Sequence, residues 1–64
     1  EKRVYIEAGL SLLSERERAA LILRDIEGLP TRDVAEQLGC SPATVRSHIA
    51  NARVKFRRYA RRTR

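Results

Sequence analysis

Residues 31–45 read TRDVAEQLGCSPATV, and this stretch decides how the chain folds. Ala35 is small enough for two helices to cross closely, and Gly39 accepts a positive φ without strain. Val45 then returns an apolar side chain to the same crossing. This three-point spacing predicts two helices that pack across each other through a tight turn, as in a helix-turn-helix.

Further helix boundaries follow from the residues on either side of that stretch. Gly and Pro mark the breaks, and between them the apolar residues recur at helical spacing. Ser14 and Glu17 can form a capping box at the start of a helix, and Gly28 suits the position just past its end. Thr31 and Ser41 are expected to be the N-caps of the two later helices. The expected helices cover 2–13, 15–27, 32–38 and 42–61.

The whole chain, 1–64, is expected to be one helix-turn-helix domain. Within it, 1–12 is a weak first helix or the end of a linker, because Gly9 interrupts it, and 60–64 is a basic tail. The predicted fold class is all-α, a small bundle of about four helices, like a winged-helix domain without the wing. The side chains expected to face the core from the second and last helices are Ala19, Ile22, Leu23, Ile26, Val45, Ile49, Ala52, Phe56 and Tyr59.

Charge is divided unevenly along the chain. Residues 41–64 contain eight Arg or Lys and no acidic residue, whereas residues 1–40 contain six basic and eight acidic residues. The formal charges of the two segments are therefore +8 and −2, which add to the net +6 of the chain. Such a basic segment attracts a polyanion. A helical hairpin that binds protein could share the spacing of the turn, but the basic segment favours DNA.

In a helix-turn-helix the first turns of the second helix enter the major groove. Arg46 is the best candidate to read a base, because its planar fork matches the O6 and N7 acceptors of guanine. The candidates for base contact are Thr44, Arg46, Ser47, Ala50 and Asn51. The candidates for phosphate contact are Thr31, Arg32, Ser41, Ala43, Arg53, Lys55 and Arg57.

Composition disfavours several other functions. No apolar run approaches the roughly 20 residues that cross a bilayer, and one cysteine with one histidine cannot make a zinc set. The chain has no Gly-rich phosphate loop, no nucleophile beside a plausible base and no paired carboxylates, so an enzyme is disfavoured. We expect no cofactor, no metal and no membrane contact, with a reducing cytoplasm as the setting.

The run from Leu13 to Arg58 resembles region 4, the C-terminal promoter-binding region of bacterial extracytoplasmic-function sigma factors in the sigma-70 superfamily. The resemblance covers most of the chain, and the combination of motifs is quite specific. The similar segments are LSERER at 13–18, LRDIEGL at 23–29, VAEQLG at 34–39, TVRS at 44–47 and AR at 52–53.

The resemblance implies a sigma-factor domain that binds the −35 element of promoter DNA and recruits RNA polymerase. It also implies that the domain grips the flexible flap of the polymerase β subunit, that an anti-sigma factor covers the same surface, and that the domain alone is a monomer. Apolar residues exceed what so small a core can bury, so some are expected to form a groove for a partner. The residues that the resemblance places at bases are Arg46, Ser47, Ala50 and Asn51, and the groove candidates are Leu12, Leu13, Ile22, Ile26 and Leu29.

Two alternatives stay open. SPA at 41–43 and SH at 47–48 depart from the commonest sigma pattern and resemble the DNA-binding module of LuxR-type response regulators, which activate transcription as dimers. The second alternative is a sigma-mimic that binds only an anti-sigma protein. RDIEG at 24–28 and the long basic last helix favour the sigma interpretation, and Arg46 with the basic face that follows it argues against a mimic.

Overall fold

The computed structural model describes residues 2–62, and helices are the only regular elements in that range. The all-α prediction is confirmed. Residues 1, 63 and 64 lie outside the described part, so two positions of the predicted basic tail are not covered. The elements are α1 (Lys2–Leu10), α2 (Glu15–Leu21), the π-helical segment η1 (Ile22–Ile26), α3 (Thr31–Leu38) and α4 (Pro42–Arg62).

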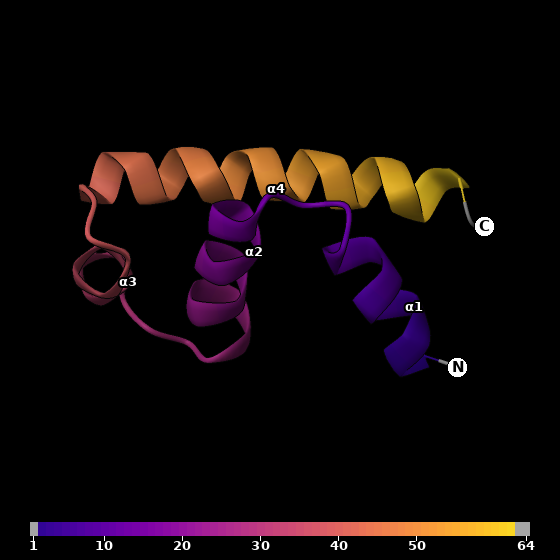
Figure 1. Cartoon of the computed structure of the whole chain (residues 1–64), viewed down its shortest axis with the longest axis horizontal. Helices are drawn as coiled ribbons and strands as arrows, with labels where there is room; N and C mark the ends of the chain where they lie inside the picture. The colour runs from indigo at the N-terminus through magenta and orange to yellow at the C-terminus, as the bar shows by residue number, and fades with distance from the viewer. Residues whose placement is uncertain (1, 63–64) are drawn as a thin grey trace.

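The long helix α4 organises the molecule (Figure 1). Helix α3 lies at its N-terminal end, α2 meets its middle, and α1 lies toward its C-terminal end. The 21 residues of α4 span roughly 31 Å at the usual helical rise, which is most of the longest dimension of 35 Å. Each of the three other α-helices therefore docks on a different part of one rod.

The core lies where α2, α3 and α4 meet. Ala20, Val34 and Val45 have no exposed surface, and Ala35 is almost fully buried. Small side chains on α2 and α3 allow the helices to approach α4 closely, as the sequence predicted for Ala35. The half-buried side chains that complete this core are Leu21, Leu23, Leu29, Leu38 and Cys40.

Gly39 makes the turn between α3 and α4, as predicted. Its φ is 67°, in the left-handed region, and the Cys40 N–H donates to the Ala35 carbonyl at 3.0 Å. A Cβ at Gly39 would meet nothing within 4 Å. A side chain at this position would therefore be strained by the backbone conformation and not by lack of space.

The caps of α2 and α4 are the predicted ones. The Glu17 N–H donates to Ser14 Oγ at 3.1 Å, and the Ser14 N–H donates to Glu17 Oε1 at 2.9 Å, which completes the capping box. At α4, the Thr44 N–H donates to Ser41 Oγ at 3.1 Å. Both helices therefore begin where the sequence placed them.

The prediction that Thr31 caps α3 is wrong. The N-cap is Pro30, which is extended with ψ 150°, and Thr31 is the first helical residue. The Pro30 carbonyl accepts hydrogen bonds from the N–H groups of Asp33 and Val34, at 2.9 and 3.1 Å. No side chain caps this helix end, because proline has no side-chain acceptor to offer.

The second predicted helix does not continue as an α-helix to residue 27. After Leu21 the chain widens into η1, where the Glu27 N–H donates to the Ile22 carbonyl at 2.9 Å, five residues back. The wider turn rotates the later side chains out of α-helical register. Ile26, which was expected in the core, is therefore 66% exposed.

The inner face of α2 also differs from the predicted stripe by one residue. Ala20 is fully buried, whereas Ala19 is only half-buried. The capping box sets the register of this helix, and its buried face runs through Glu17 and Ala20, three residues apart. The apolar stripe of α4 is as predicted, with Val45, Ile49 and Ala52 buried and Phe56 and Tyr59 half-buried.

Helix α1 docks on the C-terminal half of α4 through aromatic rings. The rings of Tyr5 and Tyr59 lie 4.9 Å apart, and Phe56 packs edge-on against both. The Tyr59 hydroxyl donates to the Tyr5 carbonyl at 2.6 Å. Gly9 is buried at the contact, and a Cβ there would lie 2.5 Å from Phe56 Cε2 and 2.8 Å from the Tyr59 ring. Gly9 is thus the point of closest approach between the two helices.

Replacing Gly9 by Ala should destabilise the chain, by up to about 2 kcal/mol. At an open helical site this change stabilises by about 1 kcal/mol, but here the new Cβ must displace two rings, and overpacking costs about 1–3 kcal/mol. Thermal unfolding followed by circular dichroism would measure it, with the exposed Glu7→Ala as control. A higher melting temperature for Gly9→Ala would contradict the close contact.

Candidate nucleic-acid interface

The face of α4 opposite its buried stripe forms an exposed ridge. All five residues predicted to contact bases lie on it, and every one is exposed. The Thr44 hydroxyl lies 3.0 Å from Ser41 Oγ, so the cap and the first turn hold each other in place. The ridge contains no acidic residue, because α4 has none. The five residues of this ridge are Thr44, Arg46, Ser47, Ala50 and Asn51.

Beside the ridge, α4, η1 and the start of α3 border an open hollow of about 320 Å³, which we term the arginine hollow. It brings together four of the predicted contact residues and adds Arg24 from η1, which the sequence reasoning missed. Arg24 is exposed and lies outside the predicted inner stripe of its helix, which was the available signal. The residues that line this hollow are Arg24, Thr31, Arg46, Ile49, Ala50 and Arg53.

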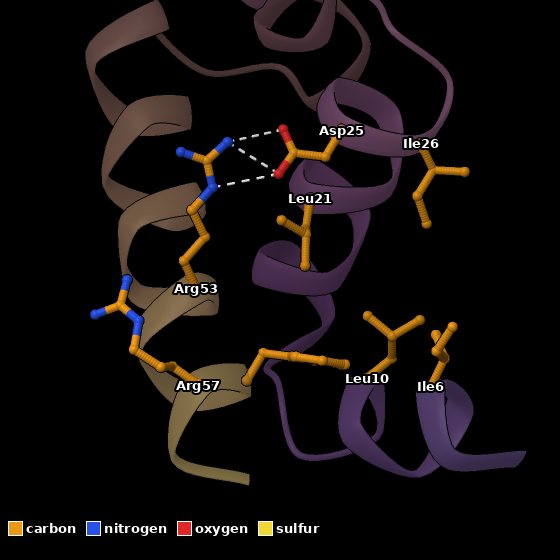
Figure 2. Close-up of a pocket in the computed structure, with 8 residues that line it drawn as sticks. Ile6, Leu10, Leu21, Asp25, Ile26, Arg53 and Arg57 are labelled. Carbon is orange, nitrogen blue, oxygen red and sulfur yellow. Dashed lines mark hydrogen bonds and ion pairs between the residues drawn. The ribbon is translucent and has the colours of Figure 1, made fainter. Parts of the chain in front are cut away.

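Two of the predicted phosphate contacts are engaged by carboxylates. Arg53 binds Asp25 through Nε and Nη2, with hydrogen bonds of 2.9 to 3.2 Å (Figure 2). Lys55 Nζ donates to Glu17 Oε1 at 2.8 Å on the opposite flank of α4. These two side chains therefore fasten α4 to α2 and η1, a role that the sequence did not predict.

The other predicted phosphate contacts, except Thr31, are open to solvent. Ser41 and Ala43 are exposed at the start of α4, and Arg57 is exposed in its second half. Thr31 is half-buried at the arginine hollow. The Arg32 side chain is 87% exposed and lies 4.0 Å from Asp33, a contact too long to hold it.

Among the acidic residues that the structure describes, Glu17 is the buried one. The Lys55 ammonium holds the pKa of this carboxyl below its ordinary value of 4.5, and the Ser14 N–H adds to the effect, while burial opposes it. Because the pKa is lowered in the folded state, the stabilisation is complete above pH 4.5 and is lost as the pH falls through the lowered pKa. The pair therefore ties the middle of α4 to the start of α2 at neutral pH.

On the other side of η1, α1, α2 and α4 border an open cleft of about 470 Å³, which we term the apolar cleft (Figure 2). Its apolar walls come from α1, α2, η1 and α4. Asp25, Arg53 and Arg57 form its charged edge. The apolar residues that line it are Ile6, Leu10, Leu21, Ile26 and Phe56.

Of the five predicted groove residues, only Ile26 lines the apolar cleft. Leu13 is buried in the α1–α2 connection, at 6% exposure, so little of its side chain is open to a partner. Leu12 is exposed on another surface, beside Lys55 and Tyr59. Ile22 is half-buried, and Leu29 lies against α3. The five predicted groove residues therefore lie on several surfaces and do not line one cleft, and their role in binding a partner stays a prediction.

Comparison with known proteins identifies the family. Residues 3–56 match the family model described as sigma-70, region 4. The chain belongs to the sigma-70 region 4 family. This is a helix-turn-helix DNA-binding family of transcription initiation and not an enzyme family, which confirms the resemblance drawn from the sequence.

A relative within the sigma factors supports the same assignment. The chain is 41% identical over 54 residues to the ECF RNA polymerase sigma factor SigE of Mycolicibacterium smegmatis. The matched stretch is 84% of this chain and 21% of the relative, so the chain spans about a fifth of that protein's length. No solved structure matches the chain.

Among the described residues, no helix is long and apolar enough to span a bilayer. The same residues contain no cluster of three His, Cys, Asp or Glu side chains that could bind a metal ion.

Replacing Glu17 by Gln should lower the free energy of unfolding at neutral pH by about 1 kcal/mol, since it removes the charge from a buried hydrogen-bonded pair. The deficit relative to wild type should shrink below pH 4.5, where wild type loses the same charge. Urea unfolding at neutral and acid pH would measure it, with the exposed Glu15→Gln as control. A deficit that stayed constant with pH would show that the charge of Glu17 contributes nothing.

Proposed function

We propose that this chain is the part of a sigma factor that binds the −35 element of promoter DNA. The observation that supports this most directly is the exposed ridge of α4, which carries all five base candidates and no acidic residue. In this proposal the N-terminal half of α4 lies in the major groove. The domain works in the cytoplasm as part of the RNA polymerase holoenzyme.

Within the groove, we assign the clearest base contact to Arg46. It is exposed on the second turn of α4, and its guanidinium has no hydrogen bond or ion pair to any residue that the structure describes. Ser47, Ala50 and Asn51 lie along the same ridge and meet neighbouring bases. The exposed start of α4, with Ser41 and Ala43, lies against the DNA backbone.

The apolar cleft is the site that we assign to the β flap of RNA polymerase. Ile26 is 66% exposed at its edge, and its apolar lining comes from three helices and η1. An anti-sigma factor that inserts an apolar helix into the same cleft would compete with the flap. The cleft lies beside the ridge and not on it, so flap and DNA can bind together.

Family membership favours the sigma proposal over a LuxR-type dimer. The sigma-mimic alternative predicts a ridge that contributes nothing to DNA binding. Both alternatives can be tested on the same chain. A LuxR-type domain would have the sedimentation coefficient of a dimer on its DNA, and a sigma-mimic would bind no preferred DNA sequence.

Replacing Arg46 by Ala should weaken binding to the preferred sequence by about 1–3 kcal/mol and weaken binding to random DNA less. The preferred sequence would be selected from a random duplex library with the wild-type chain, and affinities would be measured by fluorescence anisotropy at fixed salt. Arg61→Ala is the matched control, because Arg61 lies on the last turns of α4 and should lower both affinities alike. Equal losses on both DNAs for Arg46→Ala would reduce Arg46 to a phosphate contact.

Replacing Ile26 by Glu should abolish capture of the isolated β flap and leave DNA affinity within about twofold, since Ile26 is exposed and lies off the ridge. Leu12→Glu is the matched control, because Leu12 is 58% exposed on a different surface. A pull-down with purified flap, together with sedimentation of the free chain, would measure both. Flap capture that survives Ile26→Glu and fails with Leu12→Glu would move the partner site to the other surface.

A further inference from the structure

The arginine hollow contains more positive charge than the capping and packing of the domain require. Arg24 reaches it from η1, and Arg46 and Arg53 reach it from α4. None of its lining residues is acidic. Arg53 has Asp25 as its carboxylate partner, whereas Arg24 and Arg46 have no acidic partner among the described residues. The charge of these two side chains is therefore uncompensated at the hollow and attracts an anion.

Arg53 is held in a defined orientation at this hollow. Asp25 accepts hydrogen bonds from Nε and Nη2 of Arg53 and leaves Nη1 without an acceptor among the described residues. Figure 2 shows this third nitrogen on the far side of the guanidinium from Asp25. Because a guanidinium has five N–H donors in a rigid plane, fixing one edge fixes the direction of the other.

The position of the hollow beside the ridge indicates which anion would bind there. It lies between the ridge, at Arg46 and Ala50, and the start of α3 at Thr31. A helix that inserts into the major groove is flanked by the sugar-phosphate backbones, and the residues at its sides contact phosphates. With the ridge in the groove, a backbone phosphate falls at the hollow.

We propose that Arg24 and Arg53 bind one backbone phosphate of duplex DNA in this hollow, and that Asp25 is the positioning residue that aims Arg53 at it. The site rests on the proposed DNA-binding function. To the predicted phosphate contact Arg53 it adds Arg24 and Asp25, to which the sequence reasoning assigned no role in DNA binding. It also gives η1 a role, because the π turn places Arg24 at the hollow and Asp25 at the edge of the apolar cleft.

The positioning role of Asp25 and a simple charge effect predict opposite changes in DNA affinity for one substitution, Asp25→Asn. Asp25→Asn raises the net charge by one, which by itself strengthens binding to a polyanion. If Asp25 aims Arg53, the same change should weaken binding severalfold, because Arg53 loses its fixed orientation. In the background of Arg53→Ala, Asp25→Asn should cause no further loss. Stronger binding by Asp25→Asn would overturn the positioning role.

The phosphate itself can be located by scanning the preferred duplex with neutral methylphosphonates, one position at a time. At one position the wild-type chain should lose about tenfold in affinity, as expected for a charge-assisted hydrogen bond. Arg24→Ala and Arg53→Ala should bind this modified duplex and the natural duplex equally. The matched control, Arg58→Ala, changes an exposed arginine of the same helix outside the hollow and should keep the wild-type sensitivity.

Each result decides between the site and the function on which it rests. If Arg24→Ala kept the wild-type loss of affinity at every methylphosphonate position, the phosphate site would be overturned and the proposed function would stay intact. A wild-type chain that selects no duplex sequence would overturn the proposed function and the site together. Circular dichroism of each variant would confirm that the helices are retained, and the Asp25→Asn and Arg53→Ala pair would exclude a loss caused by unfolding.

Discussion

The whole domain depends on the burial of one apolar stripe on α4. Val45, Ile49 and Ala52 are buried along it, and Phe56 and Tyr59 extend it toward the C-terminus. Every other α-helix buries its own apolar side against this stripe, α3 and α2 in the core and α1 through the aromatic rings. Because one face of α4 holds the fold together, the opposite face is left whole, and this is what allows a chain of 64 residues to present a continuous exposed ridge.

The π turn of η1 is the second constraint, because it distributes three consecutive side chains to different surfaces. Arg24 lines the arginine hollow, whereas Asp25 and Ile26 line the apolar cleft. Arg53 borders both and is held by Asp25. The two surfaces are thus joined by a single ion pair, so a partner that moved Asp25 would also move a guanidinium next to the ridge.

Local signals predicted most of the fold. Ser14, Glu17, Gly39 and Ser41 act within three or four residues of themselves, so caps and turns could be placed from sequence alone. The prediction that Thr31 is the N-cap of α3 was wrong because the helix already begins after Pro30, which is extended. The π turn was not predicted for a different reason, since no residue type specifies a single π-helical turn.

The candidate site was predicted where it depends on one helix and missed where it depends on several. The ridge residues follow from the periodicity of α4 alone, and all five are exposed as expected. The pairing of Arg53 with Asp25 joins residues 28 apart in sequence, and that of Lys55 with Glu17 joins residues 38 apart. Such contacts, and the burial of Leu13, depend on how helices meet in space, which a single sequence does not show.

These distant pairs also explain how the charge of α4 is divided. The carboxylates of Asp25 and Glu17 engage the cations on its two flanks, Arg53 and Lys55, and leave the ridge side uncompensated. Along the axis, the first half of α4 carries Arg46 as its lone Arg or Lys, whereas six follow from residue 53 to residue 62. In the proposed function, general attraction to the DNA backbone is therefore strongest toward the C-terminal end of α4, and base recognition lies at the N-terminal end. In a separated arrangement of this kind, the basic end can hold DNA of any sequence while the N-terminal turns test it.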